Sequence, residues 1–293
     1  MFHGNSIHTI SSKYLIDILF FFLKKYIYII LLLSFQFSFA QNVIYIDLGD
    51  NSKTERKKTE EQFIVGLEIP KTKEGVSEQL IEHIGYVTSY NSEHLIPNWV
   101  SYELTALEVK GSIRRPSGKQ FEPDPLVIGN TAIHSDYTRQ RPWVRGHMAP
   151  AADMKWSIQS MNESFYLSNV IPQDSSLNDG VWERLENKVR SLATRYGAVY
   201  VCTGTVVGNN PTKIGMNKVA VPSKLFKVLC IKINNDWQTI GFLFPNAPCS
   251  GSMFDYAVPV NDIEKLTGHD FFYKLPDDIE EIIEQDCDIR KWQ

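Results

Sequence analysis

Short stretches of alternating or continuous apolar residues are spaced along most of this chain, and such stretches are typical of β-strands. They predict strands over 85–90, 99–105, 198–203, 218–221, 224–233 and 237–244, with the clearest period-two alternation in 99–105. Residues 260–268 and 276–284 predict two short helices near the C-terminus. The chain therefore combines both kinds of element.

One longer stretch has the periodicity of an amphipathic helix. Between Ser175 and Tyr196 apolar residues recur near helical spacing, with charged residues between them, and Gly197 then ends the pattern. The preceding stretch from residue 106 to about Asp153 contains five prolines, which disfavour a continuous helix or strand. We expect an α+β (mixed α/β) fold with a central antiparallel sheet flanked by helices.

The first forty residues have the layout of a signal peptide. Lys24 and Lys25 form a charged region, an apolar run follows, and Ser38-Phe39-Ala40 supplies the small residues that a signal peptidase needs. An uncleaved anchor over 15–39 is the alternative, but it would bury both lysines in the bilayer. We expect a signal peptide over 1–40, a charged lead-in over 41–70 and one domain over 71–293. Such a protein would be secreted or periplasmic, with no stable membrane association after cleavage.

Removal of residues 1–40 leaves 27 basic and 33 acidic side chains, a net charge of −6. A protein that holds nucleic acid tightly is normally basic, because phosphate contacts and counterion release dominate such binding. The acidic balance therefore argues against a long-lived nucleic-acid complex. An enzyme that releases its product needs only a local positive cleft.

Four cysteines lie in the exported part, where an oxidising compartment would allow disulfides. Cys202 and Cys230 lie inside strand-like runs, where a buried thiol is the commoner state. Cys249 and Cys287 lie in polar or terminal segments and are the preferred disulfide, although three complete pairings are possible. No cysteine or histidine spacing indicates a zinc site.

Several separated motifs occur in a fixed order. They are Trp143-Val-Arg-Gly-His-Met-Ala-Pro150, Leu177-Asn-Asp-Gly-Val-Trp-Glu-Arg-Leu-Glu186, Tyr200-Val-Cys-Thr-Gly204 and Leu266-Thr-Gly-His-Asp-Phe-Phe272. Together they resemble the DNA/RNA non-specific endonuclease family, the ββα-metal nucleases that include secreted bacterial nucleases and mitochondrial endonuclease G. The likeness covers roughly residues 80–285. It implies metal-dependent hydrolysis of phosphodiester bonds in DNA and RNA with little sequence specificity.

Phosphodiester hydrolysis needs an activated water, neutralisation of charge in the transition state and help for the leaving oxygen. A neutral imidazole can take a proton from water near pH 7, so His147 is the predicted general base. An arbitrary histidine is more often a packed or surface residue, but the Arg-Gly-His motif reverses that preference. The resemblance places the metal on the amide oxygen of Asn178, which taken alone would resemble a helix N-cap. The implied ion is Mg²⁺, with Mn²⁺ as the alternative, because Mg²⁺ often binds through one or two protein oxygens.

Other polar residues match the family by position. Glu186 lies eight residues after Asn178, about 80° around an ideal helix and about 12 Å along it, and it matches the glutamate that orders metal-bound water. Arg190 matches a neighbouring basic catalytic residue, with an exposed Glu186/Arg190 pair as the alternative. Asn169 resembles a residue that braces the site, and we place it with the substrate-binding residues.

Two arginines are expected at the substrate phosphate. Arg145 is predicted to contact it, because a guanidinium offers a planar fork of donors. The family supplies a second arginine to the transition state. Arg114 is favoured over Arg115, although the spacing to Phe121 leaves the register open.

One residue departs from the family's commonest motif, Asp-Arg-Gly-His, because Val144 stands in place of the aspartate. Its loss predicts reduced activity or an altered metal preference. A catalytically impaired nuclease-like module with a structural or binding role is therefore the alternative. No element for reading bases stands out, so phosphate contacts predict weak sequence preference, with DNA and RNA both as substrates. A homodimer remains open.

Overall fold

A computed structural model describes residues 64–293 of the chain, so the predicted signal peptide lies outside the described residues. Its centre is a seven-stranded antiparallel sheet with the order β1-β2-β3-β6-β9-β10-β11. The strands are β1 (Gln79–Glu82), β2 (Val87–Asn91), β3 (Ile96–Thr105), β6 (Ala198–Val206), β9 (Lys224–Ile233), β10 (Asp236–Pro245) and β11 (Ala257–Val258). The predicted α+β fold with a central antiparallel sheet is confirmed.

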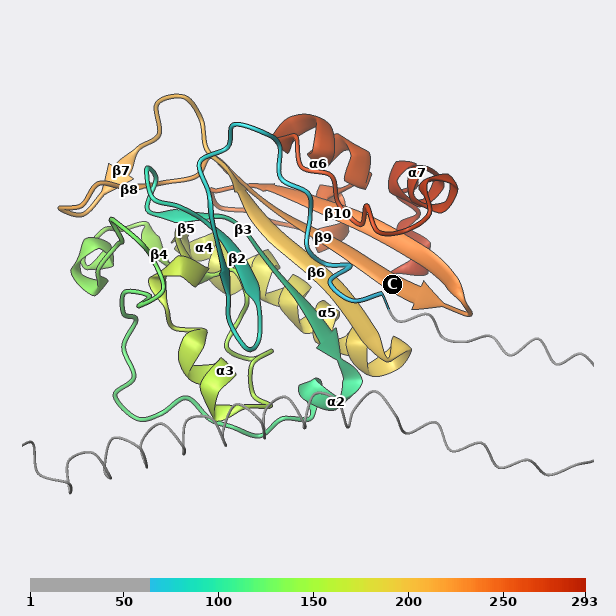
Figure 1. Ribbon diagram of the computed structural model, residues 1–293, viewed down its shortest axis with the longest axis horizontal. Coiled ribbons are helices and arrows are strands. Elements are labelled where there is room, and N and C mark those ends of the chain that lie inside the picture. Colours follow the sequence, from blue (N-terminus) through green and yellow to red (C-terminus); the bar gives the residue numbers. More distant parts are fainter. Residues whose placement is uncertain (1–63) are drawn as a thin grey trace, which may run out of the picture. The chain divides into compact units, whose positions relative to one another are not determined.

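Helices cover both faces of this sheet. Figure 1 shows α6 (Val260–Thr267) and α7 (Asp277–Gln285) beside β9 and β10, while α5 (Glu183–Tyr196) runs along the other side. The remaining elements are shorter. They are α2 (Ala106–Val109), α3 (Ile158–Glu163), α4 (Ser175–Leu177), a ribbon of β7 (Lys213–Ile214) with β8 (Val219–Ala220), and 3₁₀ turns at His134–Tyr137, Leu167–Asn169, Met253–Tyr256 and Ile289–Lys291.

The two faces of the sheet carry separate hydrophobic cores, because successive strand residues point to opposite sides. On β3, Val100 and Tyr102 pack into the core that includes α5, whereas Trp99 packs into the core that includes α6. The same alternation continues on β6 and β9. The α5 side also contains a second two-stranded ribbon, and this ribbon carries the predicted catalytic motif.

Several boundaries differ from the sequence-based expectations. The proline-rich stretch contains a strand, β4 (Trp143–His147), because five residues suffice to pair with β5 (Val170–Asp174) as a ribbon. The packed domain also begins before residue 71, since Leu67 is fully buried in the α6-side core. No helix within residues 64–293 has the length and apolar character needed to span a bilayer.

The cysteine predictions have a mixed outcome. Cys202 and Cys230 are fully buried free thiols in β6 and β9, as expected from their apolar runs. The predicted disulfide between Cys249 and Cys287 is absent, and both are free thiols. Cys249 contacts the carbonyl of Pro245 after β10, whereas Cys287 follows α7 among acidic side chains.

Candidate active site

The order of elements around His147 is strand, strand, helix. His147 ends β4 opposite Val170, the first residue of β5, and Trp143 lies opposite Asp174 at the other end of the ribbon. The Asp174 carboxylate then accepts hydrogen bonds from the amides of Ser176 and Leu177, which caps the start of α4. The ribbon and the helix share one core, so the ββα motif is a packed unit.

The predicted helix over 175–196 is not continuous. A π-turn over Asn178–Trp182 joins α4 to α5, and Gly180 inside it has non-helical backbone angles. Such insertions shift the direction of side chains and often mark functional sites. Asn178 stands at the first position of the turn, and its amide nitrogen donates to Asp179 at 2.6 Å. The Asn178 amide oxygen is the group that remains for a ligand.

His147 is half-buried between two aromatic rings. Its ring centroid lies 5.0 Å from that of Phe121 and 5.4 Å from that of Phe165. Burial, together with the nearby positive charge of Arg115, lowers the pKa of His147 to about 4. The Nε2 atom is buried and has no hydrogen-bond partner among the described residues. The imidazole is therefore neutral at pH 7, the form that can accept a proton.

Arg115, rather than the favoured Arg114, contacts this cluster. Its guanidinium carbon lies 4.4 Å from the centroid of Phe165 and 5.8 Å from that of Phe121. Its Nε and Nη2 atoms both donate to the carbonyl of Lys119, which closes the intervening loop. The hydrogen bonds to Lys119 place Arg115, and not Arg114, at the aromatic cluster. The spacing of the motif alone could not distinguish these two arginines.

Arg145 approaches the same aromatic cluster from β4. Its guanidinium carbon lies 5.8 Å from the Phe121 centroid and 5.7 Å from that of Tyr137. Its Nη2 atom donates to the carbonyl of His134 at 2.8 Å and to the Thr138 hydroxyl at 3.3 Å. Within residues 64–293, neither Arg145 nor Arg115 forms an ion pair with a carboxylate. Both charges are left for an anionic ligand.

Asn169, predicted among the substrate-binding residues, has a buried side chain that is bonded to the backbone. It is fully buried, and its side chain is occupied by the backbone: the oxygen accepts from the Ala149 amide at 2.8 Å, and the nitrogen donates to the carbonyls of Ala149 and Ser164. A side chain with no exposed atoms and three backbone bonds has nothing to offer a substrate. Asn169 instead braces the turn that follows His147.

Position 146, between Arg145 and His147, has room only for glycine. A Cβ atom at this position would lie 2.0 Å from Oε1 and 2.6 Å from Cβ of Gln173 on β5. We expect Gly146→Ala to destabilise the fold by about 1–3 kcal/mol, the usual cost of forcing an extra methyl group into a packed site. Urea unfolding measures the change. Gly208→Ala is a surface comparison, because an added Cβ atom there meets no atom within 4 Å. An unchanged midpoint in Gly146→Ala would contradict the close contact.

A buried group of charged residues lies between α5 and the sheet. Asp153 accepts hydrogen bonds from the Tyr102 hydroxyl at 2.8 Å and from Arg190 at 2.6 Å. The ion-pair partner of Arg190 is thus Asp153 rather than Glu186. Lys227 is fully buried on β9, where its amine donates to Thr203 at 2.5 Å.

Glu186 lies on α5 next to this group. Burial raises the pKa of Glu186 to about 7, with a contribution from the negative charge of Asp153, and the positive charges of Lys227 and Arg190 offset only part of this rise. The carboxylate is therefore partly protonated near neutral pH. Lys227 also lies 5.0 Å from the centroid of the Trp182 ring, at the end of the π-turn that begins with Asn178.

Comparison with known proteins identifies the family of this chain, and the matched region contains the ββα motif. A family model described as DNA/RNA non-specific endonuclease matches residues 66–278. The chain belongs to this family. Nuclease EXOG, mitochondrial, of Danio rerio is 36% identical over 208 residues, or 66% of this chain and 60% of that protein. Endonuclease G, mitochondrial, of Bos taurus is 35% identical over 203 residues, or 65% and 68%. Nuclease C1 of Cunninghamella echinulata var. echinulata is 32% identical over 219 residues, or 69% and 85%.

A solved structure agrees with these relatives of the non-specific endonuclease family. A chain in the crystal structure of the EndoG/EndoGI complex matches with a TM-score of 0.64 and 30% identity, over 69% of this chain and 89% of that one. The chain spans about 60% of the length of the EXOG relative. Because these relatives are mitochondrial or fungal nucleases, the likeness is to EndoG- and EXOG-like members, and the secreted bacterial type is not supported.

A family metal would need hard oxygen ligands. The amide oxygen of Asn178 fits this requirement for Mg²⁺, which keeps most of its water and binds through few protein groups. Within the described part of the chain, no group of three or more His, Cys, Asp or Glu side chains gathers as a metal site. A site of this kind would be built on one amide, with Glu186 as the ionisable group on α5, the helix that follows the π-turn.

Sequence reasoning missed Lys227, although its position carries a signal. It is the single charged residue in the apolar run Leu225–Ile231, and it alternates in phase with Leu225 and Leu229, which pack on the α5 side. A lone lysine on the buried face of a strand needs partners, because an unpaired buried charge is costly. That cost predicts a neighbouring acidic group.

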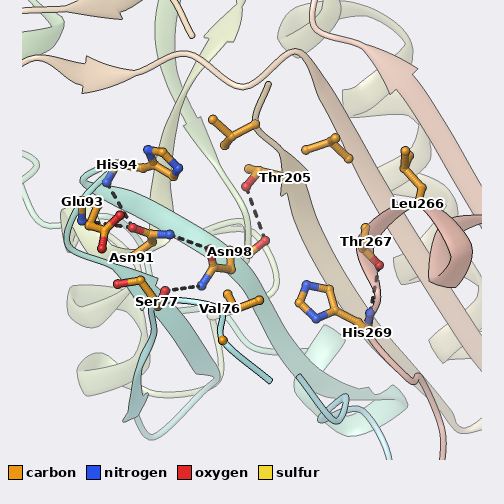
Figure 2. Close-up of a pocket in the computed structure, with 13 residues that line it drawn as sticks. Val76, Ser77, Asn91, Glu93, His94, Asn98, Thr205, Leu266, Thr267 and His269 are labelled. Carbon is orange, nitrogen blue, oxygen red and sulfur yellow. Dashed lines mark hydrogen bonds between the residues drawn. The ribbon is translucent and has the colours of Figure 1, made fainter. Parts of the chain in front are cut away.

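A polar pocket lies away from the candidate active site, between the β2–β3 turn, the end of β6 and the end of α6. Its volume is about 360 Å³. Figure 2 shows Asn98 at its centre, with His94 and Ser77 on one side and His269 on the other. Asn98 donates to the Ser77 carbonyl and accepts from Asn91, so these amides hold the turn together. None of the predicted nuclease residues lines this pocket.

Proposed function

We propose that this chain is a divalent-metal-dependent endonuclease that hydrolyses phosphodiester bonds of DNA and RNA with little sequence preference. The observation that supports this most directly is a neutral, half-buried His147 near two arginines that form no ion pair with a carboxylate of the described residues. A neutral base and two uncompensated cations are what attack by water on a phosphate diester requires. Membership of the non-specific endonuclease family agrees with this chemistry.

Each residue has a distinct task in this proposal. His147 takes the proton of the attacking water, while Arg115 and Arg145 donate to the phosphate oxygens as negative charge develops. Asn178 would hold Mg²⁺ through its amide oxygen, with Glu186 facing the water of that ion. When bound, the ion supplies charge stabilisation at a phosphate oxygen and at the leaving alkoxide.

Val144 does not remove a group from the catalytic face. Along β4, Arg145 and His147 point to one side of the ribbon, while Val144 pairs with Gln173 and points to the other. An aspartate at this position would therefore face away from the imidazole. This geometry favours an active enzyme over an impaired nuclease-like module.

Metal removal is the test of this function. The purified chain should degrade supercoiled plasmid and single-stranded RNA with Mg²⁺ or Mn²⁺, and EDTA should abolish degradation of both. Gel electrophoresis over time distinguishes nicking from exonucleolytic loss. Binding of nucleic acid without cleavage in either metal would instead support the module with a binding role.

Export is a separate proposal. It is supported by the signal-peptide layout of residues 1–40, whose lysine pair, apolar run and small-residue site occur in the required order. Fractionation of cells producing the full chain, followed by N-terminal sequencing of the mature protein, tests it. Cleavage after Ala40 and recovery outside the cytoplasm are the expected results.

A further inference from the structure

Three aromatic rings, those of Phe121, Phe165 and Tyr137, lie near the guanidinium groups of the candidate site. Phe121 packs edge-on against Phe165 at 5.2 Å between centroids, and the Tyr137 centroid lies 5.7 Å from the guanidinium carbon of Arg145. Phe165 and Tyr137 are almost fully buried, with 1% and 3% of their surface exposed. Phe121 is half-buried, so it is the ring of this group that reaches the surface of the site.

Phe121 is also the ring that lies within 6 Å of His147, Arg115 and Arg145. It lies 5.0 Å from His147, 5.8 Å from the guanidinium carbon of Arg115 and 5.8 Å from that of Arg145. Phe165 reaches His147 and Arg115, and Tyr137 reaches Arg145. Among the described residues, Phe121 is therefore the one aromatic ring that lies near all three of these groups.

The charges explain why a ring is suited to this place. Each guanidinium is held by neutral partners, the carbonyl of Lys119 for Arg115 and the carbonyl of His134 for Arg145. The face of an aromatic ring attracts a cation through its quadrupole without neutralising it. A carboxylate in the same position would fix the arginines equally well, but it would also compete with a substrate phosphate.

We propose that Phe121 is a positioning residue of the nuclease site, which holds Arg115 and Arg145 near His147 and keeps water from the part of the imidazole that it contacts. This proposal rests on the function proposed above. Phe121 does not exchange protons or bind the metal. Its effect on the reaction passes through the two arginines and the histidine that it contacts.

Replacement by leucine removes the ring while keeping an apolar side chain. We expect Phe121→Leu to lower kcat about tenfold, because cation–π contacts of partly desolvated groups are worth about one factor of ten. Phe121→Tyr keeps the ring and should restore most of the activity. Phe254→Leu is the matched control, because Phe254 is also half-buried but packs against Phe242, away from the site. It should leave kcat unchanged while changing the unfolding temperature to a similar extent.

A titration tests the same geometry without relying on activity. Burial is the main cause of the lowered pKa of His147, and Arg115 is the charged group that contributes to it. Admission of water in Phe121→Leu should therefore raise the pKa of His147 from about 4 towards its ordinary value, as followed by the ring-proton resonances in NMR. Phe254→Leu should leave the titration unchanged.

The outcomes separate this proposal from the proposed function. Equal loss of activity in Phe121→Leu and Phe121→Tyr, or an unchanged His147 titration in Phe121→Leu, would overturn the positioning role. If the parent chain were inactive but the His147 titration shifted in Phe121→Leu, the nuclease assignment would be wrong. The role of Phe121 in positioning His147 would still be supported. A loss of kcat that tracks the unfolded fraction would reduce Phe121 to an ordinary core residue.

Discussion

Replacement of His147 by alanine should lower kcat by about 10²- to 10⁴-fold, the range typical of a general base. The imidazole is held neutral by burial, and no described side chain occupies its buried Nε2 atom. Alanine leaves Arg115, Arg145 and Asn178 in place, so KM for DNA and the Mg²⁺ requirement should change little. Steady-state cleavage of a fluorescent duplex at several Mg²⁺ concentrations measures these quantities. Metal-dependent cleavage that survives the substitution at the parent rate would remove His147 from its proposed role.

The pH dependence follows from the same residue. A general base works in its neutral form, so activity governed by His147 falls as the pH falls through its pKa of about 4. This activity persists at pH 5–6, where an ordinary histidine is protonated.

The pH dependence of stability has the same origin. The folded state favours the neutral ring of His147, so protonation of the ring favours unfolding. The stability contributed by this group is therefore present above pH 6.5 and is lost as the pH falls to about 4. Urea unfolding at each pH separates the loss of activity from the loss of folded protein. A fall in the residual activity of His147→Ala at low pH would be assigned to protonation of Glu186.

Elements with a strong periodic pattern could be predicted from the sequence. The strand predicted over 224–233 coincides with β9, and Gly197 ends α5 in a positive-φ conformation that favours glycine. Elements that depend on distant partners could not be predicted. β4 is a strand because it pairs with β5 more than twenty residues later, and its own five residues sit among prolines and charges.

Motif matching located the candidate site but not the contacts of its residues. His147, Asn178 and Glu186 fall on the strand end, the π-turn and the helix of one ββα unit. The choice between adjacent arginines depended on a loop bond to Lys119, which no spacing reveals. The role of Asn169 likewise depended on burial, because a motif position does not show whether an amide faces a substrate or the backbone.

The amide of Asn169 should be the most sensitive structural group near His147. Asn169→Asp keeps the size of the side chain but loses both N–H donors, and it turns an oxygen towards the carbonyls of Ala149 and Ser164. Each buried carbonyl left unpaired costs about 1–3 kcal/mol, so we expect a loss of about 3 kcal/mol or more in the free energy of unfolding. Urea unfolding measures it. Because Ala149 lies two residues after His147, kcat should also fall in the fraction that remains folded.

Asn246 provides a matched control at the other end of the ribbon. Its oxygen accepts from the Asp174 amide, and its nitrogen donates to the carbonyls of Pro172 and Pro222, so Asn246→Asp breaks the same set of bonds. We expect a similar loss of stability. Its effect on activity should differ, because Asp174 leads into the turn with Asn178: the Mg²⁺ concentration for half-maximal activity should rise, with kcat at saturating Mg²⁺ nearly retained. If Asn169→Asp showed that metal-dependent pattern as well, the two asparagines would support the ribbon as a whole, and the link from Asn169 to the His147 turn would be wrong.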